Sequence, residues 1–290
     1  MDPYGTRLKQ HLAIYKKTHL GIAEDGIWKK NGKRYNHILP EQLKSFNILE
    51  TIRSEFWAFK RRNPEIKLHA DFHHLNSSQA MCFNLFFPFL GMPNYNVTHL
   101  LHAVNLPVAK LRSWSFERIL DEAEGTNFDL CLEFESGGRT LFEVKLSESG
   151  FARATCDKRH KEKLEFIYRP ALEGKVTPNC LEPAVFFKNY QLLRNVTYAD
   201  VDAESKVIFL YPRANTAFEV GKRFLDKVLT PRTESVVSVM YIEDVLRRLR
   251  LESARKLPSI STHLTLFEEK YMVPCDSSNE SIQPTAEGGG

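Results

Sequence analysis

Two segments of alternating residues, joined by a short glycine turn, constrain the fold of this chain most. Apolar side chains occupy the even positions of residues 128–134 and again of residues 142–146, while most odd positions are polar or charged. A period of two is typical of β-strands with one apolar face. Between them, Ser136-Gly137-Gly138 supplies the positive φ values that a tight reversal needs. The pattern predicts a β-hairpin with strands at 128–134 and 140–146.

Three charged side chains, Asp129, Glu143 and Lys145, belong to the odd positions of this hairpin. Folding the chain about Gly137 places Asp129 opposite Lys145, and a shift of two residues places it opposite Glu143. Either register keeps all three on one face, because only an odd shift turns a strand over. Two carboxylates this close repel each other unless a cation lies between them, and their hard oxygens suit Mg²⁺. Such an ion can activate a water, and Lys145 could orient or deprotonate that water or offset charge in the transition state.

The spacing alone also fits a solvated strand face with an ordinary cross-strand ion pair. Asp129 followed by Glu143-Val144-Lys145 nevertheless resembles the D…(D/E)-x-K signature of the PD-(D/E)XK nuclease superfamily, although Phe128 stands where the name-giving proline would be. The resemblance implies a restriction-endonuclease-like fold and a metal-dependent DNA endonuclease of restriction, defence or repair type. It assigns Asp129 and Glu143 to Mg²⁺, for which Mn²⁺ can substitute, and gives Lys145 a catalytic role.

The run Leu75–Leu90 carries a second resemblance. Asn76 to Gln79 is an N-cap signal, and the residues that follow are apolar on nearly all sides, which predicts a buried helix from 79 to about 90. The run is similar to the opening of a bacterial group of restriction endonucleases within the superfamily. That similarity implies substrate contacts for Ser77, Ser78 and Gln79, and capping alone explains these residues equally well.

The predicted helix 183–196, which begins with proline, carries a third resemblance. Superfamily nucleases often place a Gln or Lys on the helix between the third and fourth core strands, which makes Gln191 a candidate catalytic residue. Arg194 is expected to share its face. Family members also often bring one more acid to the metal, and Glu50, Glu55 and Glu117 stay open for that position. A solvated side chain is the more common role for each of these glutamates.

The order of predicted elements matches the αβββαβ core of that α/β fold, a mixed central sheet flanked by helices. Periodicity predicts the elements, and the family supplies their assembly. The elements are a long helix at 41–62, a helix at 99–110 interrupted by Pro107, strands at 114–120, 128–134 and 140–146, a charged helix or helix pair at 151–168, the helix at 183–196, and strands at 206–211 and 236–241 with a helix at 242–250. Residues 1–40 form an N-terminal helical extension, residues 41–272 the nuclease domain, and residues 273–290 a disordered tail.

Two basic segments could contact a phosphate backbone. Lys29, Lys30, Lys33 and Arg34 lie between Trp28 and Tyr35 around an Asn31-Gly32 turn signal, and residues 153–163 are the most basic part of the chain. Both could instead be solvated surface. His69, Asp71, His73 and His74 permit a metal site, which is the weaker interpretation because no second cluster matches it.

Composition favours an intracellular protein and is compatible with a nucleic-acid partner without demanding one. The five cysteines show no C-x-x-C spacing, and no apolar leader or membrane span occurs, so we expect a soluble, cytoplasmic protein without a membrane partner. A net charge of +4 is compatible with DNA, and double-strand cutting would favour a homodimer. An inactive nucleic-acid-binding or complex-forming member of the same fold is the alternative. A glycosidase would leave Lys145 without a role, and no G-x-S-x-G motif supports a serine hydrolase.

Overall fold

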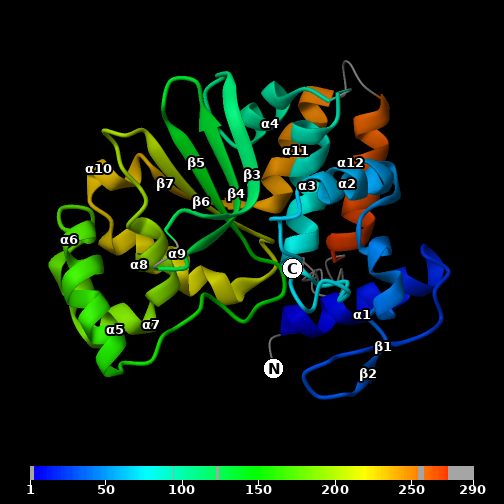
Figure 1. Ribbon diagram of the computed structural model, residues 1–290, viewed down its shortest axis with the longest axis horizontal. Coiled ribbons are helices and arrows are strands. Elements are labelled where there is room, and N and C mark those ends of the chain that lie inside the picture. The colour runs from blue at the N-terminus through cyan, green and yellow to red at the C-terminus, as the bar shows by residue number, and fades with distance from the viewer. Residues whose placement is uncertain (1–2, 94, 122–123, 254–257, 274–290) are drawn as a thin grey trace, which may run out of the picture.

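A mixed five-stranded sheet forms the centre of the molecule (Figure 1). The structure is a computed structural model that describes residues 3–93, 95–121, 124–253 and 258–273. In spatial order the strands are β3 (Leu111–Ile119), β4 (Asn127–Phe134), β5 (Arg139–Val144), β6 (Ser205–Tyr211) and β7 (Val237–Tyr241). The pairs β3–β4 and β4–β5 are antiparallel, and β5–β6 and β6–β7 are parallel. This is the α/β, restriction-endonuclease-like architecture that the sequence predicts.

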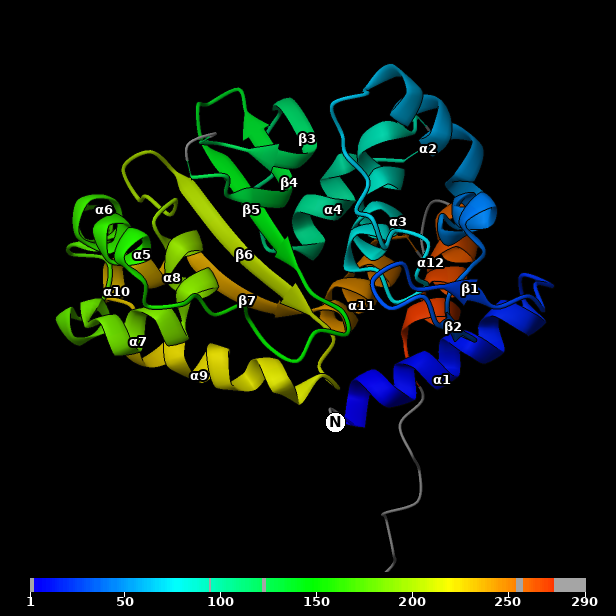
Figure 2. The same ribbon diagram turned by 60° about the horizontal axis from the view of Figure 1, so that its bottom comes forward.

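Helices cover both faces of the sheet (Figure 2). Leu130 and Ile208, at even positions of β4 and β6, join one apolar cluster, and Cys131 and Phe209, at odd positions, join the other; Phe128, near the start of β4, also joins the second cluster. Because β6 is buried on both sides, it reads as a continuous apolar run. The first cluster includes α3 (Ser78–Gly91), α4 (Val97–Ala103), α11 (Ile242–Ser253) and α12 (Pro258–Tyr271), and the second includes α7 (Pro183–Lys188), α8 (Tyr190–Val196) and α9 (Glu219–Val228). Short turns are η3 (Pro178–Leu181), η4 (Thr216–Phe218) and α10 (Pro231–Glu234).

The N-terminal residues pack against the body. Helix α1 (Pro3–Thr18) contacts α12, and its Tyr4, Leu8 and Leu12 are buried in the first apolar cluster. The Asn31-Gly32 signal is confirmed as a turn between β1 (Gly26–Ile27) and β2 (Arg34–Tyr35). The division into extension, nuclease domain and tail stays a prediction, and residues 274–290 lie outside the described part of the chain. No helix within that part is long and apolar enough to cross a bilayer, and the cellular location stays a prediction.

The helix predicted over 41–62 is instead two helices, because buried side chains capture the backbone between them. The 3₁₀ helix η1 (Glu41–Asn47) ends before α2 (Glu50–Arg62) begins. The Asn84 side chain accepts a hydrogen bond from Leu49 N at 2.8 Å and donates one to Asn47 O at 3.0 Å. Lys270 Nζ also donates to Asn47 O, at 2.5 Å. These bonds replace the helical ones across the junction.

Three other predicted helices are shorter than the pattern suggests. The helix at 99–110 ends at Ala103, before Pro107. The helix at 183–196 is interrupted at Asn189, which caps α7 with a non-helical backbone. In the segment 151–168, helix begins only after the cap residue Asp157, and it comprises α5 (Lys158–Lys163), the π-helical η2 (Leu164–Tyr168) and then α6 (Arg169–Leu172).

Candidate active site

The three charges of the predicted signature meet where β4 begins and β5 ends. Leu130 pairs with Phe142, and this antiparallel register continued by one residue places Asp129 opposite Glu143. It is the second of the two registers that the sequence allows. Lys145 follows β5 directly, and its Nζ lies 2.8 Å from Glu143 Oε1. The parity of the hairpin therefore brings all three side chains together, as predicted.

Helix α8 holds the Glu143 carboxylate from the other side. Gln191 Nε2 donates to Oε1 at 2.7 Å and Asn195 Nδ2 donates to Oε2 at 2.8 Å. The two amides are four residues apart and thus share a helix face. Glu143 is only 4% exposed, so these donors replace water around its charge. Gln191 lies on the helix where the family resemblance places it. Asn195 was not predicted as a site residue. The guanidinium of Arg194, which was expected to share the face of Gln191, lies over the Tyr190 ring.

Asp129 is held less completely than Glu143. Its Oδ2 accepts a hydrogen bond from Val144 N at 2.6 Å, and no described residue donates one to Oδ1. Burial and the negative charge of Glu143 raise the pKa of Asp129 well above its ordinary value, despite the nearby Lys145. Burial opposes the charge of Lys145, but the carboxylates of Glu143, Glu148 and Asp129 outweigh it and raise the Lys145 pKa. The site thus gathers more acidic side chains than basic ones.

Asp129 lines a cleft of about 400 Å³ whose opposite wall is the chain before and at the start of α3. Glu117 of β3 and Glu148 also line it. Glu117 has a φ of 53°, which non-glycine residues adopt rarely, and burial raises its pKa. Of the three acids left open by the sequence, Glu117 is the one beside Asp129. Glu50 and Glu55 are exposed on α2 and do not line the cleft.

Glu148 was not predicted as a site residue because it lies beyond the strand in which polar and apolar residues alternate. Its Oε2 accepts from Leu146 N at 2.7 Å, a local turn that directs the carboxylate back toward Lys145. Its position three residues after Lys145 is the sequence feature that could have indicated its role.

The cap of α3 also lines the cleft. Ser77 Oγ accepts from Ala80 N, which confirms the N-cap signal. Gln79 Oε1 accepts from His69 N at 2.9 Å and its Nε2 donates to Lys67 O at 3.0 Å, so this side chain braces the preceding loop. Ser78 lines the cleft as well. Substrate contact by these three residues stays a prediction.

The carboxylate oxygens of Asp129 and Glu143 fit a hard divalent cation. Asp129 Oδ1 is free of hydrogen bonds from the described residues, and Glu143 Oε2 has a single donor, so one oxygen of each carboxylate keeps a lone pair for a ligand. Within the described ranges no three His, Cys, Asp or Glu side chains are grouped to hold a metal. A cation here would therefore depend on two carboxylates completed by water, an arrangement typical of Mg²⁺.

The sequence was compared with known proteins. No curated protein and no solved structure gives a significant match. A family model described as "Restriction Endonuclease associating with ARP" matches residues 9–272, which include every strand of the central sheet and all of the site described above. The chain therefore belongs to this restriction endonuclease family.

Proposed function

We propose that this protein is a metal-dependent endonuclease of the PD-(D/E)XK superfamily that hydrolyses phosphodiester bonds in DNA. The observation that supports it most is the grouping of Asp129, Glu143 and Lys145 at one end of the sheet, with Glu143 fixed by Gln191 and Asn195. A solvated strand face would need no buried amide donors. The presence of these amide donors favours a functional site in which the Glu143 carboxylate is held in one orientation.

Each side chain has a role that follows from its position. Asp129 and Glu143 would hold Mg²⁺, or Mn²⁺ in its place, which when bound supplies positive charge to the phosphoryl oxygens and a reactive water. Lys145 presents its ammonium group beside Glu143, where it can orient the attacking water and offset charge that develops on the phosphate. Gln191 and Asn195 act through Glu143, as positioning residues.

Cleavage of supercoiled plasmid tests the proposal. The wild-type protein is assayed with Mg²⁺, with Mn²⁺ and with EDTA, beside Lys145→Ala. We expect nicked or linear DNA only with a metal and only from the wild type, while circular dichroism shows both proteins folded. A folded Lys145→Ala that cuts at the wild-type rate contradicts the mechanism. DNA binding without cleavage in either metal would identify an inactive member of the fold instead.

Cleavage of both strands in one binding event favours two such sites, and a homodimer would supply them. Sedimentation of the protein with and without a DNA duplex tests this part of the proposal. A monomer on DNA that nevertheless makes double-strand breaks in one binding event would contradict it.

A further inference from the structure

The β1–β2 hairpin carries a run of positive charge, and two cations at its tip form no ion pair with a described residue, although Lys30 Nζ lies over the Trp28 ring at 5.9 Å from its centroid. Lys29, Lys30, Lys33 and Arg34 are all exposed, and no acid lies between Trp28 and Tyr35. Lys29 pairs with Glu41 at 3.1 Å, and Arg34 donates to Asp25 O at 2.8 Å. Lys30 and Lys33, on either side of Asn31-Gly32, have no carboxylate partner among the described residues. Two charges at the tip thus remain for an external anion.

Buried contacts fix the base of this hairpin to the body. Lys16 of α1 is fully buried and donates to Glu24 O at 2.7 Å and Asp25 Oδ1 at 2.8 Å. Gly26 lies so close to the neighbouring chain that an added Cβ would be 2.1 Å from Leu39 O. The tip therefore projects from a rigid base, which reduces the entropy lost when it binds a partner.

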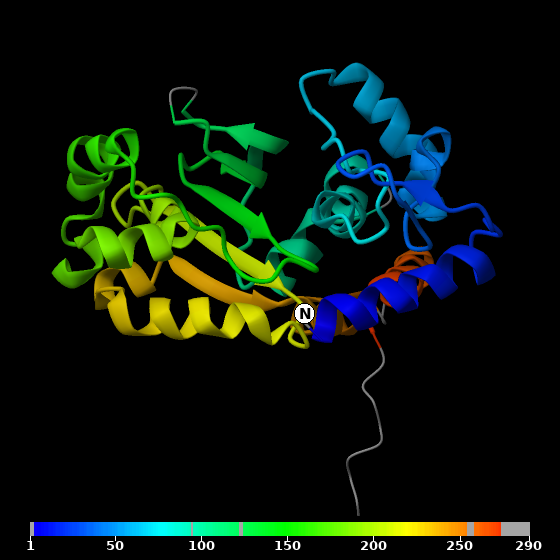
Figure 3. The ribbon, with the colours of Figure 1, turned by 90° about the horizontal axis from the view of Figure 1, so that it is seen from below.

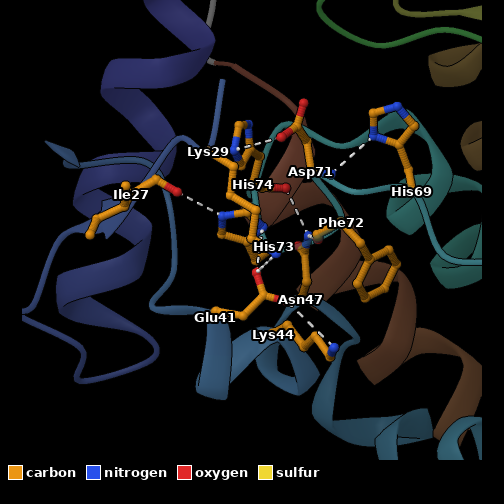
Figure 4. Close-up of polar contacts among 10 residues, drawn as sticks. All are labelled: Ile27, Lys29, Glu41, Lys44, Asn47, His69, Asp71, Phe72, His73 and His74. Atoms are coloured by element: carbon orange, nitrogen blue, oxygen red, sulfur yellow. Dashed lines mark hydrogen bonds and ion pairs between the residues drawn. The ribbon is translucent and has the colours of Figure 1, made fainter. Parts of the chain in front are cut away.

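Histidines join the hairpin to the wall of the active-site cleft. His73 is 1% exposed, and its Nε2 donates to Ile27 O at 3.0 Å while its Nδ1 faces Glu41 Oε2 at 3.3 Å. Figure 4 shows His73 between these two partners. The neighbouring His74 ring packs edge-on to Trp28, with centroids 6.2 Å apart. His74 also lines the cleft that contains Asp129, so the hairpin packs directly against a residue of the cleft wall.

Basic residues also border the other side of the site. Residues 151–154 follow β5 and pair with α8, since Ala152 N donates to Gln191 Oε1 and Gln191 N donates to Ala152 O. Arg153 and Lys158 beyond this contact are exposed. In Figure 3 the hairpin lies on one half of the molecule and α5 on the other, with the end of β5 between them. A polyanion crossing the carboxylates would meet positive charge on both sides.

We propose that the tip of the β1–β2 hairpin clamps the phosphate backbone of double-stranded DNA, with Lys30 and Lys33 each contacting a phosphate. The inference rests on the proposed function, because it takes DNA as the ligand of the cleft. Lysine side chains are flexible point charges, so the clamp adds affinity without reading sequence. Trp28 and Tyr35, whose ring centroids are 6.0 Å apart, keep the hairpin's shape beneath those charges.

Salt-dependent binding of the full chain to a fluorescent 30-bp duplex, with Ca²⁺ replacing Mg²⁺, tests the clamp. The variant is Lys30→Ala/Lys33→Ala. Its matched control is Arg223→Ala/Lys227→Ala, which removes the same charge from exposed positions of α9 on the other half of the molecule. We expect the hairpin variant to bind about 10–100-fold more weakly near 0.1 M salt, with a log K against log[salt] slope less steep by about 2. The control should stay within twofold of the wild type.

The charge-conserving Lys30→Arg/Lys33→Arg variant should bind like the wild type, and thermal unfolding of all variants should be unchanged because the positions are exposed. Equal slopes and affinities for the hairpin and control variants would overturn the clamp, as would a wild type that binds no duplex. Hairpin-dependent binding to vesicles containing phosphatidylserine, with DNA binding unaffected, would overturn it in favour of a membrane surface.

Failure of the clamp and failure of the proposed function give different results. A wild type that binds DNA through the hairpin but never cuts it refutes only the nuclease. Metal-dependent cutting with full affinity in the Lys30→Ala/Lys33→Ala variant refutes only the clamp.

Discussion

Removal of a side-chain amide that donates to Glu143 should lower the free energy of unfolding, and the loss should be larger when Glu143 carries a charge than when a neutral side chain replaces it. Asn195 Nδ2 is 2.8 Å from Glu143 Oε2, and both residues are buried. A hydrogen bond to a charged group contributes about 1.5–3 kcal/mol, so Asn195→Ala should lower the free energy of unfolding by about 2 kcal/mol. Gln191→Ala should cost more, about 3 kcal/mol, because it also removes the bond from Ala152 N.

A double-mutant cycle measured by urea denaturation separates the charge from the packing. In a Glu143→Gln background the same Asn195→Ala change removes a neutral hydrogen bond, worth about 1 kcal/mol. We therefore expect a coupling energy of about 1 kcal/mol between the two positions. Because Asn195 orients a proposed metal ligand, Asn195→Ala should also weaken the apparent Mg²⁺ affinity about 10–100-fold.

An equal loss of stability in both backgrounds would show that Asn195 contributes packing and does not stabilise an ionised Glu143. No loss in either background would refute the geometry of α8 against β5. Asn189→Ala serves as the matched control, since its side-chain amide donates to Val185 O within α7 and forms no hydrogen bond with Glu143 among the described residues.

Two further predictions concern the buried polar groups of the helical half. Burial lowers the pKa of His263 to about 4, and its Nε2 donates to Asn84 O while its Nδ1 accepts from Thr51, so the folded state holds it neutral. An unfolded histidine takes up a proton below about pH 6.5, so this residue should remove up to about 3 kcal/mol of stability as the pH falls from 6.5 to 4. His263→Gln should flatten that part of the stability–pH curve, and an unchanged curve would contradict the assignment. Asn84→Leu should cost about 2–4 kcal/mol by denaturant titration, because it leaves Leu49 N without an acceptor and removes a bond to the Tyr271 hydroxyl; a cost below 1 kcal/mol would mean that η1 and α2 separate for another reason.

Much of the site could be predicted because its signal is local. Strand parity places Asp129, Glu143 and Lys145 on one face without knowledge of the fold, and only the choice between two even registers needed the β4–β5 pairing. Gln191 came from the family resemblance. Asn195 could not be assigned in the same way, since its role depends on α8 lying over β5, which no local pattern reports.

The helix boundaries were predicted less well because distant residues decide them. Asn84 and Lys270 capture the backbone at Asn47 from more than thirty residues away in the sequence, and this ends η1 where the apolar periodicity continues. Helix α9, in contrast, could have been predicted from the sequence, because Phe224, Leu225 and Val228 repeat at helical spacing on its buried side.

The most direct test of the account is the rate at which the wild type and Asp129→Asn cleave supercoiled plasmid in Mg²⁺. The substitution keeps the size of the side chain, and burial together with Glu143 already disfavours an ionised Asp129 in the free protein, so the variant should fold at least as well as the wild type. Loss of a direct ligand should exceed the roughly 10–100-fold effect of losing an outer partner, so we predict that the variant is slower by more than about 100-fold. A folded Asp129→Asn that cleaves within twofold of the wild-type rate would contradict the assignment of this site as the nuclease centre.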